Sequence, residues 1–452
     1  MAYDLVVVGA GPGGFAAALE ASQCGATVAV VERGSWGGTC SHWGCIPTKA
    51  LLASSKRYTE ATKLKRMGVS AAETAFNFPA MKRHQNQMVR ISAAGIQQQL
   101  KAAQVAKVEG EGIILSPGEV EVTGSDDKKE RIKTRNILIA WGSKPALLPE
   151  IEFSDRILSS RTFLAMDTLP GSVVIVGGGA IGVEFATFLA ELGAEVTLLE
   201  LMEQILPTEE KEAAEFLEKE LRKLGIEIFT SVSVEAITEN DEGVYVKAMN
   251  GGEVLEREAE YALICVGRQP YLRTEELERL SIGYDRKGIQ VDGRLATTVD
   301  TIFAVGDVTG GILLAHRAMA QGRACARALF GDESIPYTDD AVPAVVYTHP
   351  GVARVGLTEE NARAEGLDVT VRKSEYGYNL TARTEMMGTG FVKTLFSDTT
   401  LVGATIVGER AGELIAPVSL AVANRMTVSD LRKWVIPHPT LSELLFIIGD
   451  SH

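Results

Sequence analysis

Two cysteines, Cys40 and Cys45, lie in one short segment with four residues between them, and their spacing suits redox chemistry. Glycines flank the pair, and Pro47 fits the first turn of a following helix, where a missing N–H costs little. Cys45 would then lie at the helix N-terminus, whose partial positive charge favours a reactive thiolate. Lys49, four positions on and on the same helical face, would add a cation there. We interpret the pair as a redox-active disulfide.

The spacing alone leaves other interpretations open. Free cysteine is among the most buried residue types, so both thiols could be ordinary core side chains. A structural cross-link is disfavoured, because so short a loop constrains the unfolded chain weakly and nothing in the sequence indicates an oxidising compartment. A zinc site would need more ligands than His42 can supply.

The composition is that of a soluble globular enzyme with many tight turns. The 452 residues include 45 glycines, 46% hydrophobic and 23% charged residues, and they are too many for a single hydrophobic core. We therefore expect about three or four domains. The formal charge of −14 argues against general nucleic-acid binding, because no basic face is available to neutralise phosphates.

The sequence enters an apolar strand at once, without the basic region and cleavage site of a signal peptide. It has no apolar run long enough to span a bilayer. We expect a cytoplasmic protein that does not bind membranes, a setting where a disulfide is more often catalytic than structural. Cys24, Cys265 and Cys325 stand singly in apolar surroundings and are predicted to be core thiols.

The first 32 residues have the pattern of a dinucleotide-binding βαβ unit, with strands over 5–8 and 27–31 and a helix over 15–23. Gly9 permits the tight turn, Gly11 lets the backbone approach a pyrophosphate, and Gly14 lets the helix pack on the strand. The helix N-terminus offers N–H groups to phosphates, and Glu32 can accept from ribose hydroxyls. A glycine triad alone is weak evidence, but the whole succession of elements is specific.

The same pattern recurs with Gly177, Gly179 and Gly182 and ends at Glu200. The offset is constant, since 177 − 9 and 200 − 32 both equal 168, which indicates an internal duplication. A carboxylate at Glu200 would bond the 2′-hydroxyl of NAD but repel a 2′-phosphate, for which arginine is expected. The three residues after Glu200 carry no positive charge, so the second site is predicted to take NAD.

Elsewhere, the pattern predicts helices across 51–100 with a break at 76–79, and strands over 107–115, 119–123, 136–140, 262–266 and 301–305. The last of these strands delivers Asp307, for which we favour a ligand role over an ordinary strand-to-loop acid. Beyond about residue 340, an antiparallel sheet is expected over 344–347, 367–372, 390–396 and 401–407, with helices over 411–424 and 428–434.

His438 stands between two prolines, and Glu443 follows five residues later, within reach if a turn folds back. A carboxylate so placed would hold the imidazole in one tautomer and raise its basicity, which suits proton transfer near neutral pH. Taken by itself, the segment is more typical of a turn histidine that caps the next helix. We expect no comparable setting of acid and proline around the other histidines, which are His42, His84, His316, His349 and His452.

Together these motifs resemble the flavin-dependent pyridine nucleotide disulfide oxidoreductases, and within them the branch that oxidises dihydrolipoyl groups. The resemblance covers nearly the whole chain. Its most specific parts are segments 38–40 and 44–49, the two glycine triads in order, Gly306–Asp307 followed by 314–316, and 438–440 with Glu443.

The resemblance implies an α/β fold with two Rossmann-like domains, for FAD over 1–145 and NAD over 146–267. Residues 268–340 would complete the FAD site, and 341–452 would form an α+β dimerisation domain. The implied FAD-binding residues are Gly9, Gly11, Gly14, Glu32, Arg33, Lys49, Gly142, Asp307 and Ala315, and those for NAD are Gly177, Gly179, Gly182, Glu200 and Gly267. Asp307 would bond the ribityl chain, and the backbone near Ala315 would meet the flavin ring.

The resemblance also implies catalytic roles. Cys45 would lie against the flavin as the charge-transfer thiol, and Cys40 would exchange with the substrate. His438, oriented by Glu443, would serve as the acid-base group and come from the other subunit of a homodimer. Glu184 would pair with Lys49 beside the nicotinamide. The implied activity is oxidation of dihydrolipoamide on a lipoylated carrier protein of a 2-oxoacid dehydrogenase or glycine-cleavage system.

Two residues depart from the family pattern: Trp141 replaces a usual threonine, and Tyr271 an asparagine. One alternative is an NAD(P)H-dependent reductase of another small disulfide. A mercuric reductase would need a cysteine pair after Cys325, and a glutathione reductase would need arginines after the second glycine triad. A non-catalytic flavoprotein scaffold is disfavoured, because the cysteines, lysine, glutamates and histidine are all present.

Overall fold

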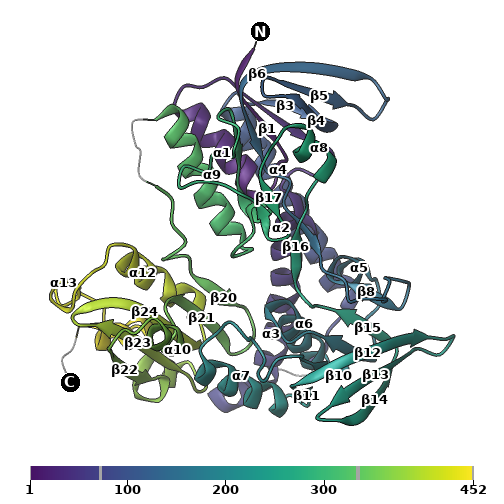
Figure 1. Cartoon of the computed structure of the whole chain (residues 1–452). Helices are drawn as coiled ribbons and strands as arrows, with labels where there is room; N and C mark the ends of the chain where they lie inside the picture. The colour runs from purple at the N-terminus through teal and green to yellow at the C-terminus, as the bar shows by residue number, and fades with distance from the viewer. Residues whose placement is uncertain (1, 71–73, 332–335, 450–452) are drawn as a thin grey trace. The chain divides into compact units, whose positions relative to one another are not determined.

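The computed structural model describes residues 2–70, 74–331 and 336–449, and the chain divides into two compact units (Figure 1). Unit 1 contains Met1–Ala50, Pro79–Ala146 and Gly267–Asp339. Unit 2 contains Leu51–Phe78, Leu147–Val266 and Asp340–His452. Each unit is assembled from three separate segments, so residues far apart in the sequence meet within it.

The main sheet of unit 1 is built from β1 (Tyr3–Val8), β2 (Val28–Glu32), β3 (Ala106–Glu109), β4 (Glu111–Ser116), β5 (Glu119–Thr123), β6 (Lys129–Ile139) and β19 (Ile302–Ala304). The order is β3-β2-β1-β6-β5-β4, with β19 paired to β6. The strands β3, β2, β1, β6 and β19 run parallel, and their valine, leucine and isoleucine runs are largely buried. Their carboxyl ends therefore share one edge, where dinucleotides bind in such sheets.

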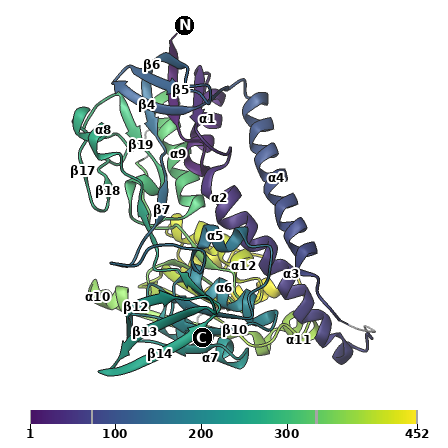
Figure 2. The same ribbon diagram turned by 90° about the vertical axis from the view of Figure 1, so that its right-hand side faces the viewer.

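Helices α1 (Pro12–Gln23) and α9 (Ala315–Phe330) pack side by side in unit 1 (Figure 1). Their backbones approach so closely that a Cβ at Gly322 of α9 would lie 2.3 Å from the carbonyl oxygen of Gly13, which a side chain could not do without a shift of the helices. Figure 2 shows α4 (Phe78–Ala102) as one long helix. The smaller elements of this unit are α2 (Gly38–Trp43), the start of α3 (Cys45–Lys63), α8 (Thr274–Arg279), β7 (Ser143–Pro145), β16 (Arg268–Pro270), β17 (Tyr284–Asp285) and β18 (Gly288–Ile289).

Unit 2 contains a second parallel sheet, formed by β8 (Ile157–Ser159), β9 (Ser172–Val176), β10 (Glu195–Leu199), β11 (Glu227–Phe229) and β15 (Tyr261–Ile264). Its order is β11-β10-β9-β15-β8. The associated helices are α5 (Ser160–Ala165), α6 (Ala180–Glu191) and α7 (Lys211–Lys223). An antiparallel sheet is formed by β12 (Val232–Glu239), β13 (Val244–Asn250) and β14 (Glu253–Ala259), and a tight turn at 251–252 joins β13 to β14.

The C-terminal part of unit 2 is an antiparallel sheet of β20 (Ala344–Val346), β21 (Gly351–Gly356), β22 (Val369–Glu375), β23 (Phe391–Ser397) and β24 (Thr400–Gly408). The strand order is β20-β21-β24-β23-β22. Its helices are α10 (Glu359–Ala364), α11 (Leu380–Thr384), α12 (Ala411–Ala423) and α13 (Val428–Leu431), followed by the 3-10 helix Leu441–Ile448.

The structure confirms both βαβ units and the α/β class, and it corrects two details. The strand expected over 107–115 is interrupted at Gly110, whose φ of 151° ends β3. β3 pairs in parallel with β2, whereas β4 pairs antiparallel with β5, so the two halves belong to different ladders. β21 was not predicted, although it lies inside the C-terminal sheet. No helix among the described residues is long and apolar enough to cross a membrane.

Candidate active site

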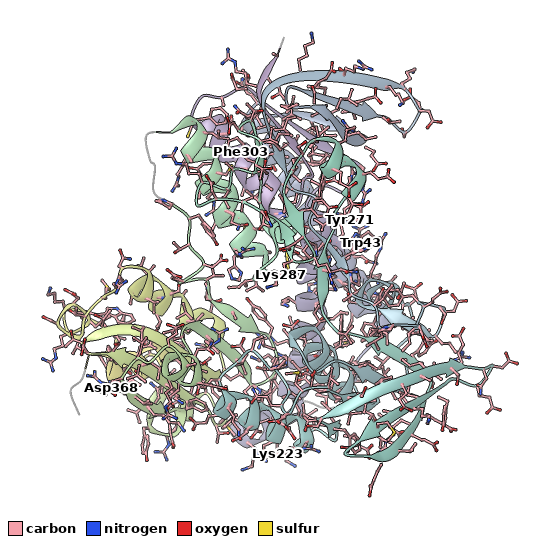
Figure 3. The ribbon with its side chains drawn as sticks, in the orientation of Figure 1. Trp43, Lys223, Tyr271, Lys287, Phe303 and Asp368 are labelled. Atoms are coloured by element: carbon pink, nitrogen blue, oxygen red, sulfur yellow. A yellow bond between two sulfur atoms is a disulfide. The ribbon has the colours of Figure 1, made fainter. Side chains whose placement is uncertain are left out.

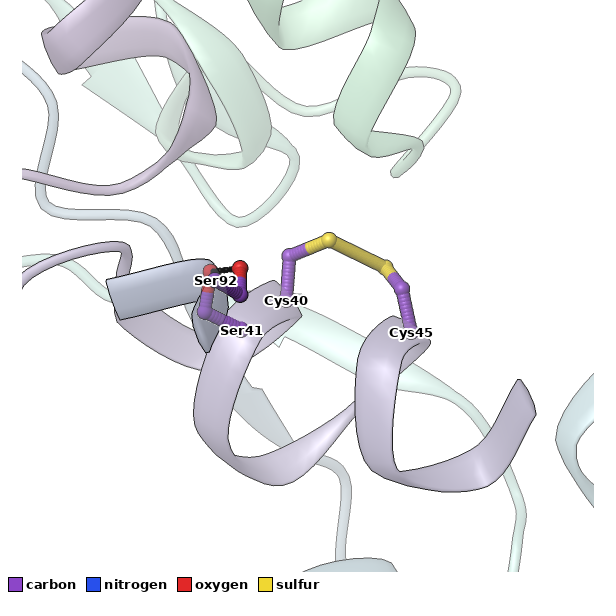
Figure 4. Close-up of a disulfide and its surroundings, with 4 residues drawn as sticks. All are labelled: Cys40, Ser41, Cys45 and Ser92. Atoms are coloured by element: carbon purple, nitrogen blue, oxygen red, sulfur yellow. Dashed lines mark hydrogen bonds between the residues drawn. A yellow bond between two sulfur atoms is a disulfide. The ribbon is translucent and has the colours of Figure 1, made fainter. Parts of the chain in front are cut away.

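The disulfide joins the predicted N-terminus of one helix to a second, short helix that the sequence did not predict, because the stretch between the two thiols was expected to be a loop. Cys40 lies in α2, Cys45 is the first residue of α3, and their Cα atoms are 4.7 Å apart (Figure 4). This separation lies within the range that a disulfide can bridge. The predicted helix N-terminus at Cys45 is confirmed, and Lys49 follows in the same helix. The backbone N–H groups of that first turn favour negative charge on the Cys45 sulfur.

The redox segment is docked on the first glycine turn by its backbone. The N–H of Gly37 donates to the carbonyl of Ala10 at 3.0 Å. Gly38 has a φ of 58°, and a Cβ there would lie 2.9 Å from the Cα of Gly11, so a larger residue would push the two segments apart. The predicted dinucleotide turn and the predicted redox pair therefore form one site.

Two side-chain contacts also hold α2. The hydroxyls of Ser41 and Ser92 lie 3.0 Å apart, which links α2 to α4 (Figure 4). Nε2 of His42 lies 3.0 Å from the carbonyl oxygen of Trp36. No group of three or more possible metal ligands occurs among the described residues. Through its contact with the Trp36 carbonyl, His42 holds α2 to the segment that precedes it.

A cavity of about 340 Å³ lies against Cys40. Its wall contains Cys40 and does not contain Cys45. The lining residues are Pro12, Phe15, Cys40, Ser41, Ile46, Ile91, Ser92, Gly95, Ile96, Gln99 and Met319. These side chains are mostly apolar, and none is ionised at neutral pH. The sequence did not reveal the cavity, because its wall combines residues of α1, α2, α3, α4 and α9.

The first glycine turn fits a bound pyrophosphate. Gly9 has a φ of 111°, and a Cβ there would lie 2.3 Å from the carbonyl oxygen of Ala140. A Cβ at Gly14 would lie 2.0 Å from the carbonyl oxygen of Gly9. Gly11, in contrast, has no atom within 4 Å of a built Cβ, which leaves room for phosphate at the N-terminus of α1.

The second turn repeats this geometry in unit 2. A Cβ at Gly182 would lie 1.9 Å from the carbonyl oxygen of Gly177, and the space at Gly179 is again open. Glu200 is 6% exposed and accepts from the backbone N–H groups of Gly178 at 2.5 Å and Met202 at 2.8 Å.

Glu32 makes the equivalent contacts in unit 1. Its carboxylate accepts from the N–H groups of Ala10 and Gly34, both at 2.7 Å. Each carboxylate oxygen has a second lone-pair direction. Both acids are therefore held in place and still able to accept from a ribose hydroxyl.

Asp307 lies in the 3-10 helix Gly306–Thr309 and is held by residues that the sequence did not single out. The hydroxyl of Ser143 donates to its Oδ2 at 2.5 Å, and Nε of Arg268 donates to that hydroxyl at 2.8 Å. Burial lowers the pKa of Arg268, an effect that Asp307 opposes. The nearby turns use Gly142 at φ 75° and Gly267 at φ 104°, while Ala315 is the first residue of α9.

The two departures from the family pattern pack against arginines. The guanidinium of Arg273 lies 5.1 Å from the ring centroid of Trp141, and that of Arg33 lies 5.1 Å from the ring centroid of Tyr271, which is labelled in Figure 3. Arg33 also pairs with Glu111 at 3.2 Å. Arg33 follows Glu32 directly, so this cluster lies next to the first dinucleotide turn.

The predicted acid-histidine pair forms. Nδ1 of His438 lies 2.7 Å from Oε1 of Glu443, and the N–H of Thr440 donates to Oε2 at 3.2 Å. The hydrogen bond from His438, followed by that from Thr440, lowers the pKa of Glu443. The imidazole is 69% exposed, so a second molecule can reach it.

Two expectations about single residues need correction. His349 has an acid-and-proline setting after all, because it precedes Pro350 and its Nδ1 lies 2.7 Å from Oε1 of Glu191. The acid is 158 positions away in the sequence, so no local pattern could reveal it.

The second correction concerns Cys24, which was expected to be a core thiol but is half-buried and caps α1. Cys265 and Cys325 are buried as expected, and burial raises the pKa of both thiols. His452 lies outside the described residues.

Comparisons with known proteins agree with this geometry. Residues 3–322 match the pyridine nucleotide-disulphide oxidoreductase model, and residues 342–446 match the dimerisation domain of the same family. The chain belongs to this family, and the second match supports a homodimer. Among its curated relatives is the dihydrolipoyl dehydrogenase of Geobacillus stearothermophilus, which is 37% identical over 98% of this chain and 94% of that enzyme.

Two solved structures are also similar. LpdA from Mycobacterium tuberculosis has a TM-score of 0.92 and 29% identity, and the match covers 98% of both chains. The HOCl-induced flavoprotein disulfide reductase RclA from Escherichia coli has a TM-score of 0.86 and 28% identity over 100% of both chains. The fold and the disulfide site are thus those of flavoprotein disulfide reductases.

The Glu443 contacts predict a pH-dependent contribution to stability. A carboxyl group with a lowered pKa stabilises the folded chain above its unfolded pKa, and this stabilisation is lost as the pH falls through the folded pKa. Glu443→Gln should lower the Tm at pH 7, and the difference from wild type should shrink below about pH 4. Glu365→Gln, at an exposed glutamate, is the control. A difference in Tm that stays constant across this range would contradict the assignment.

Proposed function

We propose that the chain is a dihydrolipoyl dehydrogenase, which oxidises protein-bound dihydrolipoamide to lipoamide and reduces NAD. The observation that carries the proposal is the Cys40–Cys45 disulfide beside an apolar cavity. Relatives 36–37% identical over 98% of the chain carry this name. Part of the proposal is a cytoplasmic setting, as the sequence predicts.

The cavity is suited to a lipoyl arm. The arm has an aliphatic chain and a neutral amide, and burying apolar surface against Ile46, Ile91 and Met319 would stabilise it by about 25 cal/mol per Å². Glutathione carries carboxylates and an amine, and these need charged or polar partners when they leave water. Among the described residues that line the cavity, none has an ionised side chain. The lining therefore favours a dihydrolipoyl substrate over a charged disulfide.

The two cysteines have different roles in thiol-disulfide exchange. A substrate thiolate attacks Sγ of Cys40, which faces the cavity, and the Cys40–Cys45 bond breaks. Cys45 leaves as a thiolate stabilised by the N-terminus of α3. The second substrate sulfur then attacks the mixed disulfide, which releases Cys40 and the oxidised lipoyl ring. Two electrons pass from the substrate to the cysteine pair.

The protons from the substrate thiols need an acceptor. We assign this role to His438, whose imidazole is oriented by Glu443 at 2.7 Å. In the homodimer, the exposed imidazole of one subunit would serve the disulfide of the other, as the family resemblance implies. One proton would end on His438 and the other on Cys40, so the exchange is balanced.

The residues around each glycine turn would hold the cofactors. Bound FAD supplies the two-electron chemistry that connects the dithiol to the nicotinamide. The open space at Gly11 would receive its phosphates, Glu32 would accept from its adenosine ribose, and Asp307 is proposed for the ribityl chain. The remaining proposed FAD-binding residues are Gly9, Gly14, Arg33, Lys49, Gly142 and Ala315.

NAD is proposed to bind at the second turn. Glu200 would accept from its 2′-hydroxyl, and the proposed backbone contacts are Gly177, Gly179, Gly182 and Gly267. Glu184 belongs to unit 2 and Lys49 to unit 1, so their pairing beside the nicotinamide stays a prediction from the resemblance. A lipoylated carrier protein of a 2-oxoacid dehydrogenase or glycine-cleavage system is the proposed macromolecular partner.

The substrate assignment is tested by steady-state turnover of the purified holoenzyme. With dihydrolipoamide and NAD, NADH should form rapidly, whereas NADPH with glutathione disulfide should react at least about 100-fold more slowly in kcat/KM, equivalent to about 2.7 kcal/mol. Faster reduction of glutathione disulfide by NADPH would contradict the proposal and favour the alternative of a reductase for another small disulfide.

The cavity makes a more specific prediction. Gly95 lines it, and a Cβ built there meets no atom within 4 Å, so the first atom of a larger side chain has room at the cavity wall. Gly95→Leu should raise the KM for dihydrolipoamide about tenfold, the equivalent of about 1.4 kcal/mol, and leave the KM for NAD unchanged. Gly377→Leu, at another glycine with open space, is the matched control. Equal KM values for dihydrolipoamide in wild type and Gly95→Leu would exclude the cavity as the substrate site.

A further inference from the structure

Helix α6 ends in a buried carboxylate whose contacts come from two distant segments of unit 2. The side chain of Glu191 is 2% exposed. Its Oε2 accepts from the hydroxyl of Ser55 at 2.5 Å, and its Oε1 lies 2.7 Å from Nδ1 of His349. The acid therefore joins α3 and the turn between β20 and β21 to the same end of α6.

The chemistry of these groups fixes the direction of the hydrogen bonds. An ionised carboxylate can only accept hydrogen bonds. In its pair with an ionised Glu191, Nδ1–H of His349 is therefore the donor. A buried carboxylate is tolerated when it is paired and hydrogen-bonded, and loss of one partner leaves a charge without compensation. Ser55 is fully buried and neutral. Ser55 and His349 thus each contact one oxygen of the buried carboxylate, and removing the His349 ring would leave Oε1 without the contact it makes here.

A second carboxylate on α6 holds the same segment. Glu184, 4% exposed, accepts from the backbone N–H of Tyr347 at 2.9 Å. Glu184 and Glu191 are seven residues apart, which places them on one face of the helix, two turns from each other. The hydroxyl of Thr348 donates to the carbonyl of Pro350 at 2.6 Å and closes the turn between these anchors. Residues 347–350 are therefore attached to α6 at two points.

We propose that His349 is a positioning residue of the second dinucleotide site. By pairing with Glu191, it holds residues 347–350 against α6, and through Tyr347 this segment fixes the carboxylate of Glu184. Glu184 lies near the start of α6, two residues after Gly182, the last glycine of the turn proposed to hold NAD, and the proposal is that its position affects NAD binding there. This inference rests on the proposed binding of NAD at that turn.

The inference is tested by measuring the Kd for NAD on the oxidised holoenzyme, by fluorescence titration. His349→Ala should weaken NAD binding by about 10- to 100-fold, because a displacement of about 1 Å in a positioned group has effects of this size. The KM for dihydrolipoamide should change less than about twofold. His349→Asn, whose amide N–H replaces Nδ1–H, should recover most of the affinity. His84→Ala, at an exposed histidine, is the matched control.

A double-mutant cycle tests the connection with variants that keep side-chain size. If Glu191 acts through the segment that fixes Glu184, the effects of Glu191→Gln and Glu184→Gln on the Kd for NAD should not multiply. The double variant should bind NAD about as weakly as Glu184→Gln alone. Multiplicative effects, or an unchanged Kd in a folded His349→Ala protein, would overturn the inference. Failure to oxidise dihydrolipoamide would instead contradict the proposed function, because the binding measurement does not depend on that substrate.

Discussion

The close contact between the redox segment and the first glycine turn is the constraint on which the active site depends. Gly38 and Gly11 approach so closely that a Cβ on Gly38 would lie 2.9 Å from the other backbone. This contact fixes α2, and the disulfide then fixes the start of α3 relative to α2. The two sulfurs consequently differ in environment: Cys40 lines an apolar cavity, and Cys45 lies at a helix N-terminus. The different roles proposed for the two sulfurs follow from this difference in environment.

The two glycine turns, which are related by an internal duplication, keep the same hydrogen bonds between the turn and an acidic side chain. In each, the acid at the end of the second strand accepts from the backbone N–H that follows the first glycine, at 2.7 Å for Glu32 and 2.5 Å for Glu200. Each acid also accepts from the N–H two residues later. The side chain is thereby held in position before any ligand binds, which reduces the entropy lost on binding. The second βαβ unit has two further contacts: Glu184 accepts from the backbone N–H of Tyr347, and Glu191 contacts His349, beside strands of the C-terminal sheet.

The sequence predicted those features whose chemistry lies within a short segment. The cysteine pair, both glycine turns, their terminal acids and the His438–Glu443 pair depend on residues at fixed short spacing, so local patterns reveal them. The strand Gly351–Gly356 was missed because it begins and ends with glycine, a residue that is depleted in strands. The contacts of Ser143 with Asp307 and of His349 with Glu191 join residues 164 and 158 positions apart. Such contacts depend on tertiary packing, which no local pattern encodes.

The proposed exchange requires Cys40 to be the sulfur that the substrate attacks. The direct measurement is to reduce the holoenzyme anaerobically with one equivalent of dihydrolipoamide, alkylate it briefly with iodoacetamide, and locate the label by peptide mapping. We predict that Cys40 carries the label and Cys45 remains unmodified, because Cys40 lines the cavity. Preferential labelling of Cys45, or labelling of Cys24 with both redox cysteines unmodified, would contradict the account.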